Sequence, residues 1–127
     1  MANAIYPKYK EALLNGSANT NMSSGTVKVA LVDTGTYTYS ATHEFLSSLT
    51  GRVGTDATLG TKTFTNGTFD AANSTYTAVS GATVEALVIY IDTGVAGTSR
   101  LIAYIDTGVA GLPVTPYPNE PTTGMWQ

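Results

Sequence analysis

The octamer Tyr-Ile-Asp-Thr-Gly-Val-Ala-Gly occurs twice, at residues 90–97 and again at residues 104–111, within the stretch from Val84 to Pro116. Each copy ends a run of apolar, strand-favouring residues, and each run stops at Asp-Thr-Gly, where turn-forming residues begin. The runs are apolar at both odd and even positions, which is typical of strands that are covered on both faces. We therefore expect a central β-hairpin here, with its loop near residues 94–99.

The composition indicates one β-rich domain with few charges. The chain has 127 residues, of which 12% are charged, and threonine is the commonest residue. This length suits a single core. Threonine favours strands, so the composition suits a β-rich protein whose exposed faces carry hydroxyl groups rather than charges. The formal net charge is −3 and the six basic residues are scattered, whereas nucleic-acid binding requires clustered positive charge. We therefore expect no nucleic-acid partner.

The sequence contains few residues that could bind a metal and no segment that could span a membrane. It contains no cysteine and one histidine, His43, so disulfides and thiolate metal sites are excluded and a zinc site has almost no ligands. We expect no metal and no cofactor. No apolar run has the length of a membrane span, and no basic and apolar leader opens the sequence. We expect a soluble protein that is made in the cytoplasm.

Local patterns predict the elements that surround the hairpin. Pro7 and Gly16 are suited to the start and end of a short helix. Residues 26–33 alternate as a half-buried strand, and Ser40 can cap a helix over residues 41–49. Residues 53–60 give only a weak signal and are interpreted as an irregular connection. A further short strand is expected at residues 75–79.

Asn66-Gly67 is the sequence of a two-residue type I′ hairpin turn, whose central residues need positive φ. Such a turn places Phe64 and Phe69 opposite each other, and we expect both rings to point into the core. Together these patterns predict a mostly β protein. We expect an antiparallel β-sandwich or barrel of about six to eight strands with one or two short helices.

The chain is predicted to divide into two parts. Residues 1–112 form the single β-rich domain with its short N-terminal helix, and residues 113–127 form a proline-rich, extended C-terminal arm that holds four of the five prolines. Such an arm can be a disordered tail, can fold back over its own domain or can reach a neighbouring subunit. In the last case the interface would use aromatic and methionine anchors, and the predicted interface residues are Tyr117, Met125, Trp126, Tyr6 and Tyr9.

Two patterns in the sequence could indicate catalysis. Asp-Thr-Gly after apolar residues is the local sequence of an aspartic protease, but it occurs three times, at Asp33, Asp92 and Asp106. A strand-ending turn, in which the carboxylate accepts backbone hydrogen bonds, explains all three copies. A glycosidase needs paired acids at a set separation, which sequence alone cannot provide for Glu44, Asp56, Asp70 or Glu85. We therefore assign no catalytic residue and expect a protein that is not an enzyme.

Four long segments carry a resemblance to a known family. They are Ala-Ile-Tyr-Pro-Lys-Tyr-Lys-Glu-Ala-Leu-Leu near the start, the run from Val27 to Leu46 that contains Val-Asp-Thr-Gly-Thr-Tyr-Thr-Tyr-Ser, Glu-Ala-Leu-Val-Ile-Tyr-Ile-Asp-Thr-Gly, and Ser-Arg-Leu-Ile-Ala-Tyr-Ile-Asp-Thr-Gly. Over residues 2–116 the chain resembles small virion proteins of tailed bacteriophages. It departs from them at Tyr117-Pro118-Asn119-Glu120, where those proteins continue with Asn-Gly-Gly-Asp and a last strand.

The resemblance implies a structural protein of a phage particle. With the weakly charged β domain and its adhesive termini, it favours a capsid decoration, or cement, protein that binds the mature shell on the capsid surface of the virion. The expected partners are the major capsid protein and further copies of the chain, as a symmetric trimer or dimer. The alternatives are a tail or fibre component that attaches to the host and, more remotely, a homodimeric aspartic protease.

Overall fold

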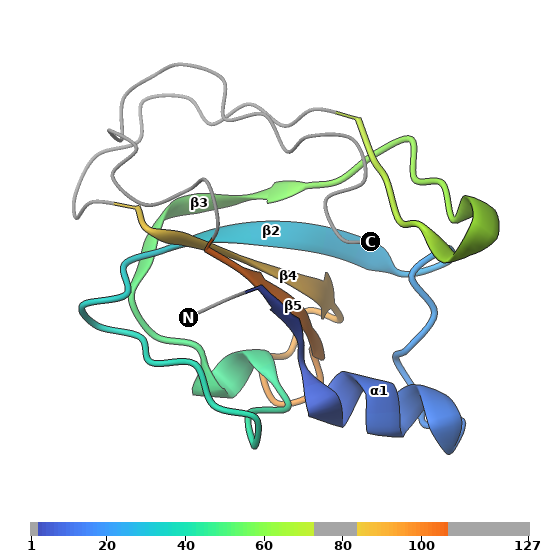
Figure 1. Cartoon of the computed structure of the whole chain (residues 1–127), viewed down its shortest axis with the longest axis horizontal. Coiled ribbons are helices and arrows are strands. Elements are labelled where there is room, and N and C mark those ends of the chain that lie inside the picture. The colour runs from blue at the N-terminus through green and yellow to red at the C-terminus, as the bar shows by residue number, and fades with distance from the viewer. Residues whose placement is uncertain (1–2, 73–83, 107–127) are drawn as a thin grey trace.

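The hairpin predicted from the repeated octamer lies within an antiparallel sheet. The computed structural model describes residues 3–72 and 84–106. β4 (Ala86–Asp92) pairs with β5 (Leu101–Ile105) on one side and with β2 (Thr26–Val32) on the other. The order across the sheet is β1-β5-β4-β2-β3, with the short β1 (Ala4–Ile5) and β3 (Arg52–Thr58) at its edges (Figure 1). The mostly β, antiparallel class is confirmed, and the described residues form one sheet of five strands.

Both faces of the central strands are covered, as the apolar runs predict. Every residue of β5 is buried, and so is the run from Val88 to Ile91 in β4. β2 is more buried than its alternating pattern indicates, because Ala30 and Val32 on the face of Lys28 are also inaccessible to solvent. Burying a large aliphatic side chain of this kind stabilises a fold by about 1.5–3 kcal/mol. These three strands therefore hold the core together.

β3 is a strand where the sequence predicts an irregular connection. Most of its residues are exposed or half-buried, and Val53 is its buried aliphatic residue, so the sequence carries little strand signal. The free edge of β2 provides the backbone partners, and this tertiary pairing outweighs the weak local propensity. Val29 pairs with Ala57 and Leu31 pairs with Val53, so residues 54–56 lie opposite Ala30 alone. This bulge bends the edge strand and redirects its side chains.

The N-terminal helix forms where predicted, although its contacts differ from the expectation. α1 (Pro7–Leu14) begins at a proline, and Gly16 follows it with a φ of 70°. Tyr9 and Ala12 are its buried residues, whereas Leu13 is 50% and Leu14 90% exposed. Helical spacing in the sequence predicts one packed side made of Tyr6, Tyr9 or Lys10, Leu13 and Leu14. This prediction is wrong for the two leucines. Tyr9 of the same side is buried, and its hydroxyl donates to the backbone oxygen of Thr20 at 2.7 Å.

The helix predicted over residues 41–49 is absent. The structure has only the 3-10 turn η1 (Leu46–Ser48) in this segment. The preceding residues run beside the connection between β4 and β5, where the Leu46 amide donates to the oxygen of Ser99 (2.7 Å) and the Leu101 amide donates to the oxygen of Glu44 (3.0 Å). Backbone bonds to a distant segment thus replace the local bonds of a helix.

The turn at Asn66-Gly67 is confirmed, with one difference in burial. Asn66 and Gly67 have φ values of 53° and 76°, and the bridge between Thr63 and Asp70 gives the predicted register. The turn itself is assigned as the 3-10 segment η2 (Thr65–Gly67). The rings of Phe64 and Phe69 lie 5.5 Å apart, but Phe69 is buried and Phe64 is 40% exposed. The prediction that both rings enter the core is wrong for Phe64, which covers Phe69 from outside.

Several predictions fall on residues that the structure does not describe. These are the strand at residues 75–79, the arm at residues 113–127 and the second copy of the octamer beyond Asp106.

Candidate functional site

The Asp-Thr-Gly motifs form turns in the two copies whose glycine is described. The Asp33 carboxylate accepts a hydrogen bond from the Gly35 amide at 2.9 Å. The Asp92 carboxylate accepts the equivalent bond from the Gly94 amide, also at 2.9 Å. Both are bonds from the backbone two residues further on, as in an Asx-turn. The interpretation of these motifs as strand-ending turns is therefore confirmed at Asp33 and Asp92.

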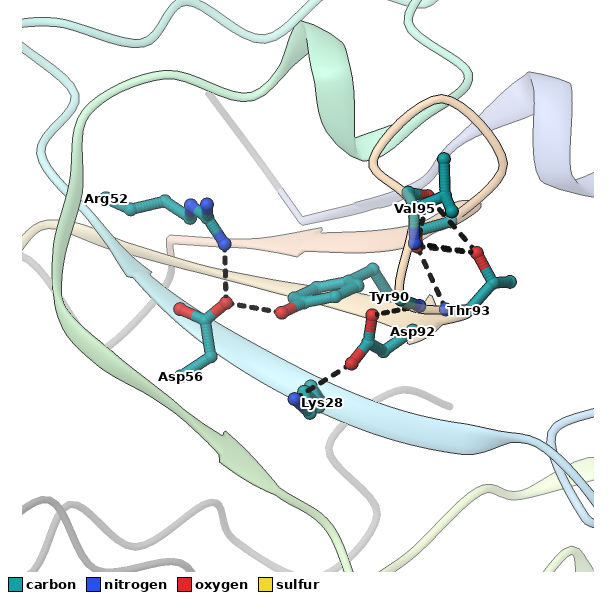
Figure 2. Close-up of polar contacts among 9 residues, drawn as sticks. Lys28, Arg52, Asp56, Tyr90, Asp92, Thr93 and Val95 are labelled. Carbon is teal, nitrogen blue, oxygen red and sulfur yellow. Dashed lines mark hydrogen bonds and ion pairs between the residues drawn. The ribbon is translucent and has the colours of Figure 1, made fainter.

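A polar cluster crosses the sheet from the edge strand to the centre (Figure 2). The Arg52 guanidinium lies 2.7 Å from the Asp56 carboxylate, and the hydroxyl of Tyr90 donates a hydrogen bond to the same carboxylate oxygen. Asp56 belongs to the β3 bulge, which turns its side chain toward β4. Burial, and then the hydrogen bond to Asp56, raise the pKa of Tyr90 well above its ordinary range. The three residues join β3 to the centre of the sheet.

A second ion pair lies next to this cluster. The Lys28 ammonium is 2.8 Å from the Asp92 carboxylate, on neighbouring strands β2 and β4 (Figure 2). The hydrogen bond from Lys28, followed by the bond from the Gly94 amide, lowers the pKa of Asp92. Asp92 thus binds both its own turn and the adjacent strand. The charges in this region are compensated within the sheet.

A hydrogen-bond chain of two tyrosines and a histidine joins the loop between β2 and β3 to Tyr6, just before α1. The hydroxyls of Tyr6 and Tyr37 lie 2.8 Å apart, and that of Tyr37 lies 2.7 Å from Nδ1 of His43. Burial, and then the bond to Tyr37, raise the pKa of Tyr6 far above its ordinary range. His43 ends a hydrogen-bond chain that fixes this loop.

A hollow of about 490 Å³ opens beside this chain. Its lining residues come from three parts of the chain that are distant in sequence: Thr34, Tyr37, Thr38, Tyr39, Glu85, Tyr104 and Asp106. The ring of Tyr39 lies 5.3 Å from that of Tyr104 and 5.1 Å from that of Tyr6. Tyr37 and Tyr104 are buried and form the back of the hollow, whereas Tyr39, Glu85 and Asp106 remain partly accessible.

The carboxylates of the hollow lie at the ends of the central strands. Glu85 precedes β4, where its amide donates to the oxygen of Val32 (2.9 Å) and its carboxylate accepts the Thr34 hydroxyl (2.9 Å). Asp106 follows β5 directly, and its amide donates to the side chain of Asn3 (2.9 Å). Burial raises the pKa of Tyr104, and the charges of Asp106 and Glu85 raise it further. The hollow therefore combines aromatic walls with negative charge.

The sequence did not predict this hollow as a site. The pair Tyr37 and Tyr39 in the Tyr-Thr-Tyr run was the available signal, because alternate residues of an extended segment face the same side. No local sequence pattern indicates that these tyrosines lie near Glu85 or Tyr104, because the pairing of the strands brings these distant segments together.

The predicted interface residues are only partly described. Tyr6 and Tyr9 lie in the core, with exposed fractions of 0% and 4%, so in the single chain their side chains support the fold. Tyr117, Met125 and Trp126 lie outside the described residues. An interface formed by the arm stays a prediction.

The carboxylates considered for a glycosidase do not gather at one site. Glu44 pairs with Arg100 at 2.9 Å, Asp56 pairs with Arg52, and Asp70 accepts the amide of Ala71. Within residues 3–72 and 84–106, no group of three or more His, Asp or Glu side chains could hold a metal ion. No helix of that part of the chain is long and apolar enough to cross a membrane.

No protein-family model, curated protein or solved structure matches the chain.

Proposed function

We propose that the chain is a structural protein of a tailed-bacteriophage particle, and specifically a decoration protein that binds the mature capsid. The observation that carries the proposal is how the described polar side chains are used. Asp33 and Asp92 hold turns, and His43 bonds to Tyr37. These three side chains thus stabilise the scaffold. Such a domain acts by binding rather than by chemistry.

The sequence supports the choice of partner. The resemblance to small virion proteins runs over residues 2–116, and the charged fraction of 12% is low for a protein that works alone in solution. Two leucines at the end of α1, Leu13 and Leu14, are half and almost fully exposed. Exposed apolar side chains gain free energy when another protein covers them. A symmetric lattice offers the same contact many times.

The proposal is tested by adding the purified protein to capsids of the encoding phage that were assembled without it. A cement protein binds the mature lattice and not the unexpanded form, so it stabilises the mature shell by mass action. We expect co-sedimentation with mature capsids that saturates at a fixed ratio of chains to shell subunits, together with a higher temperature of capsid disruption. Equal binding to mature and unexpanded capsids, or no binding, would contradict the proposal.

A second candidate function is host attachment as a tail or fibre component. The tyrosine-lined hollow favours it, because the partly accessible Tyr39 lies on the connection between β2 and β3 rather than at a terminus. Aromatic clusters on loops are a common feature of recognition surfaces. Specific binding of the protein to host cells, with no binding to capsids, would select this function over the first.

A further inference from the structure

The hollow described above has the chemistry of a receptor for an organic cation. Its described lining consists of three tyrosines, two threonines and two carboxylates, and it contains no lysine, arginine or histidine. A volume of about 490 Å³ is in the range of sites that accept a small ligand or a single side chain. Tyrosine faces attract cations, and carboxylates add direct Coulomb attraction.

Glu85 is held in place for such a role. Its amide is bonded to Val32 and its carboxylate to the Thr34 hydroxyl, so two contacts fix its position. No ion pair of Glu85 occurs within the described part of the chain, where four of the other carboxylates, on Glu11, Glu44, Asp56 and Asp92, are paired with a basic residue. The second oxygen of Glu85 can therefore accept a donor from a ligand.

The arrangement of the rings favours a planar cation. Tyr39 and Tyr104 are tilted by 48° to each other, at a centroid distance of 5.3 Å, so the wall is a corner rather than a flat platform. A guanidinium group can stack on one face of such a corner while its N–H groups reach a carboxylate. An ammonium group lacks the plane for stacking, and a neutral sugar gains nothing from the negative charge.

We propose that the hollow bounded by Tyr39, Tyr104 and Glu85 binds the guanidinium group of an arginine side chain presented by a protein partner. The site is independent of where the chain acts, since a shell subunit or a host receptor could each supply the arginine. The partner arginine inserts between the ring of Tyr39 and the carboxylate of Glu85.

The test is an NMR titration of the full chain with Nα-acetyl-arginine amide, in which the ring signals of the tyrosines are followed. The neutral isostere Nα-acetyl-citrulline amide and the sugar maltose are the comparison ligands. We expect saturable shifts of Tyr39 and Tyr104 with the arginine derivative and at least about fivefold weaker binding of citrulline, because it lacks the charge. Equal binding of arginine and citrulline, stronger binding of maltose, or no saturable shift would each overturn the proposal.

Matched variants locate the binding site. Glu85→Gln keeps a side-chain oxygen for Thr34 and should weaken arginine binding at least about fivefold, whereas Glu11→Gln makes the same charge change on α1 and should leave binding unchanged. Tyr39→Phe keeps the aromatic face and should retain binding, while Tyr39→Leu should lose it. The one-dimensional proton spectrum of each variant verifies that it is folded. Equal loss of affinity in Glu85→Gln and Glu11→Gln would place binding elsewhere.

Discussion

At the scale of single residues, the hydroxyl of Tyr90 connects the bulged edge strand to the centre of the sheet. It donates to Asp56, which also binds Arg52. The sequence predicts Tyr90 as a buried strand residue, because it belongs to a run that is apolar at both odd and even positions. Its partner was beyond prediction, because Asp56 lies in a segment without strand signal and reaches Tyr90 only through the bulge. The Asp-Thr-Gly turns, in contrast, depend on bonds two residues apart and were predictable.

Removal of the Tyr90 hydroxyl tests the cluster. Tyr90→Phe should lower the free energy of unfolding by about 1–3 kcal/mol, because the buried part of the Asp56 carboxylate loses a donor. Tyr39→Phe is the matched control, since Tyr39 makes no hydrogen bond in the described structure, and it should change the free energy by less than about 0.5 kcal/mol. Urea unfolding followed by circular dichroism measures both. Equal effects would show that the hydroxyl of Tyr90 adds nothing specific.

The pair of Asp92 and Lys28 predicts a dependence on pH. Because the folded state lowers the pKa of Asp92, the unfolded chain binds this proton more readily. The resulting stability is present above about pH 4, the ordinary pKa of an aspartate, and is lost as the pH falls through the folded value. Asp92→Asn retains an oxygen for the Gly94 amide and removes the charge.

The variant Asp92→Asn should therefore be less stable than the wild type by about 0.5 kcal/mol at pH 7, a modest value because the pair is partly exposed. The difference should vanish toward pH 2–3. Urea unfolding at several pH values measures it. A difference that is constant across this range would contradict the assignment of the effect to the carboxylate charge.

At the scale of elements, the sequence identified those whose signal is local. The helix after Pro7, the strand β2, the hairpin of β4 and β5 and the turn at Asn66-Gly67 all depend on apolar runs or turn chemistry. β3 and the segment at residues 41–49 depend instead on backbone partners distant in sequence. No local pattern encodes such partners. The sequence therefore does not indicate the strand β3 and wrongly predicts a helix over residues 41–49.

Gly51 lies in close contact with the loop that follows β2. It precedes β3 with a φ of 66°, and a Cβ atom there would lie 2.9 Å from both the oxygen of Asp33 and the Cβ of Thr36. Gly51→Ala should therefore cost about 2–4 kcal/mol, from the left-handed backbone and the clash together. Gly16→Ala is the control, because Gly16 has a φ of 70° but open space around it, and should cost only about 1–2 kcal/mol. Thermal unfolding compares the two, and similar losses would exclude the clash.

At the scale of the whole molecule, the proposed function combines a rigid sheet with surfaces that bind other proteins. Four carboxylates of the described residues pair with basic side chains, and Leu14 and the tyrosine hollow remain accessible. The arm predicted at residues 113–127 would add the predicted interface residues Tyr117, Met125 and Trp126. These features are consistent with the proposed role in assembly. The residues proposed to contact other proteins are different from those that form the core of the sheet.

The variant Trp126→Ala tests whether Trp126 anchors the chain to its neighbour or belongs to the core of its own domain. If the arm anchors the chain to its neighbour, the substitution should weaken binding to mature capsids by up to about 2–4 kcal/mol per site. The urea midpoint of the isolated chain should stay unchanged. Quantitative co-sedimentation and urea unfolding of the same preparation give the two values. A parallel loss of stability would instead assign Trp126 to the core of its own domain.

The number of copies of this chain in purified phage particles, relative to the major capsid protein, tests the proposed function most directly. Quantitative mass spectrometry of intact particles measures this ratio. A decoration protein occupies every equivalent position of the lattice, so we predict a ratio near one or a simple fraction of it set by the symmetry of the shell. A handful of copies per particle would place the chain in the tail or at a vertex, and complete absence from the particle would contradict the structural role.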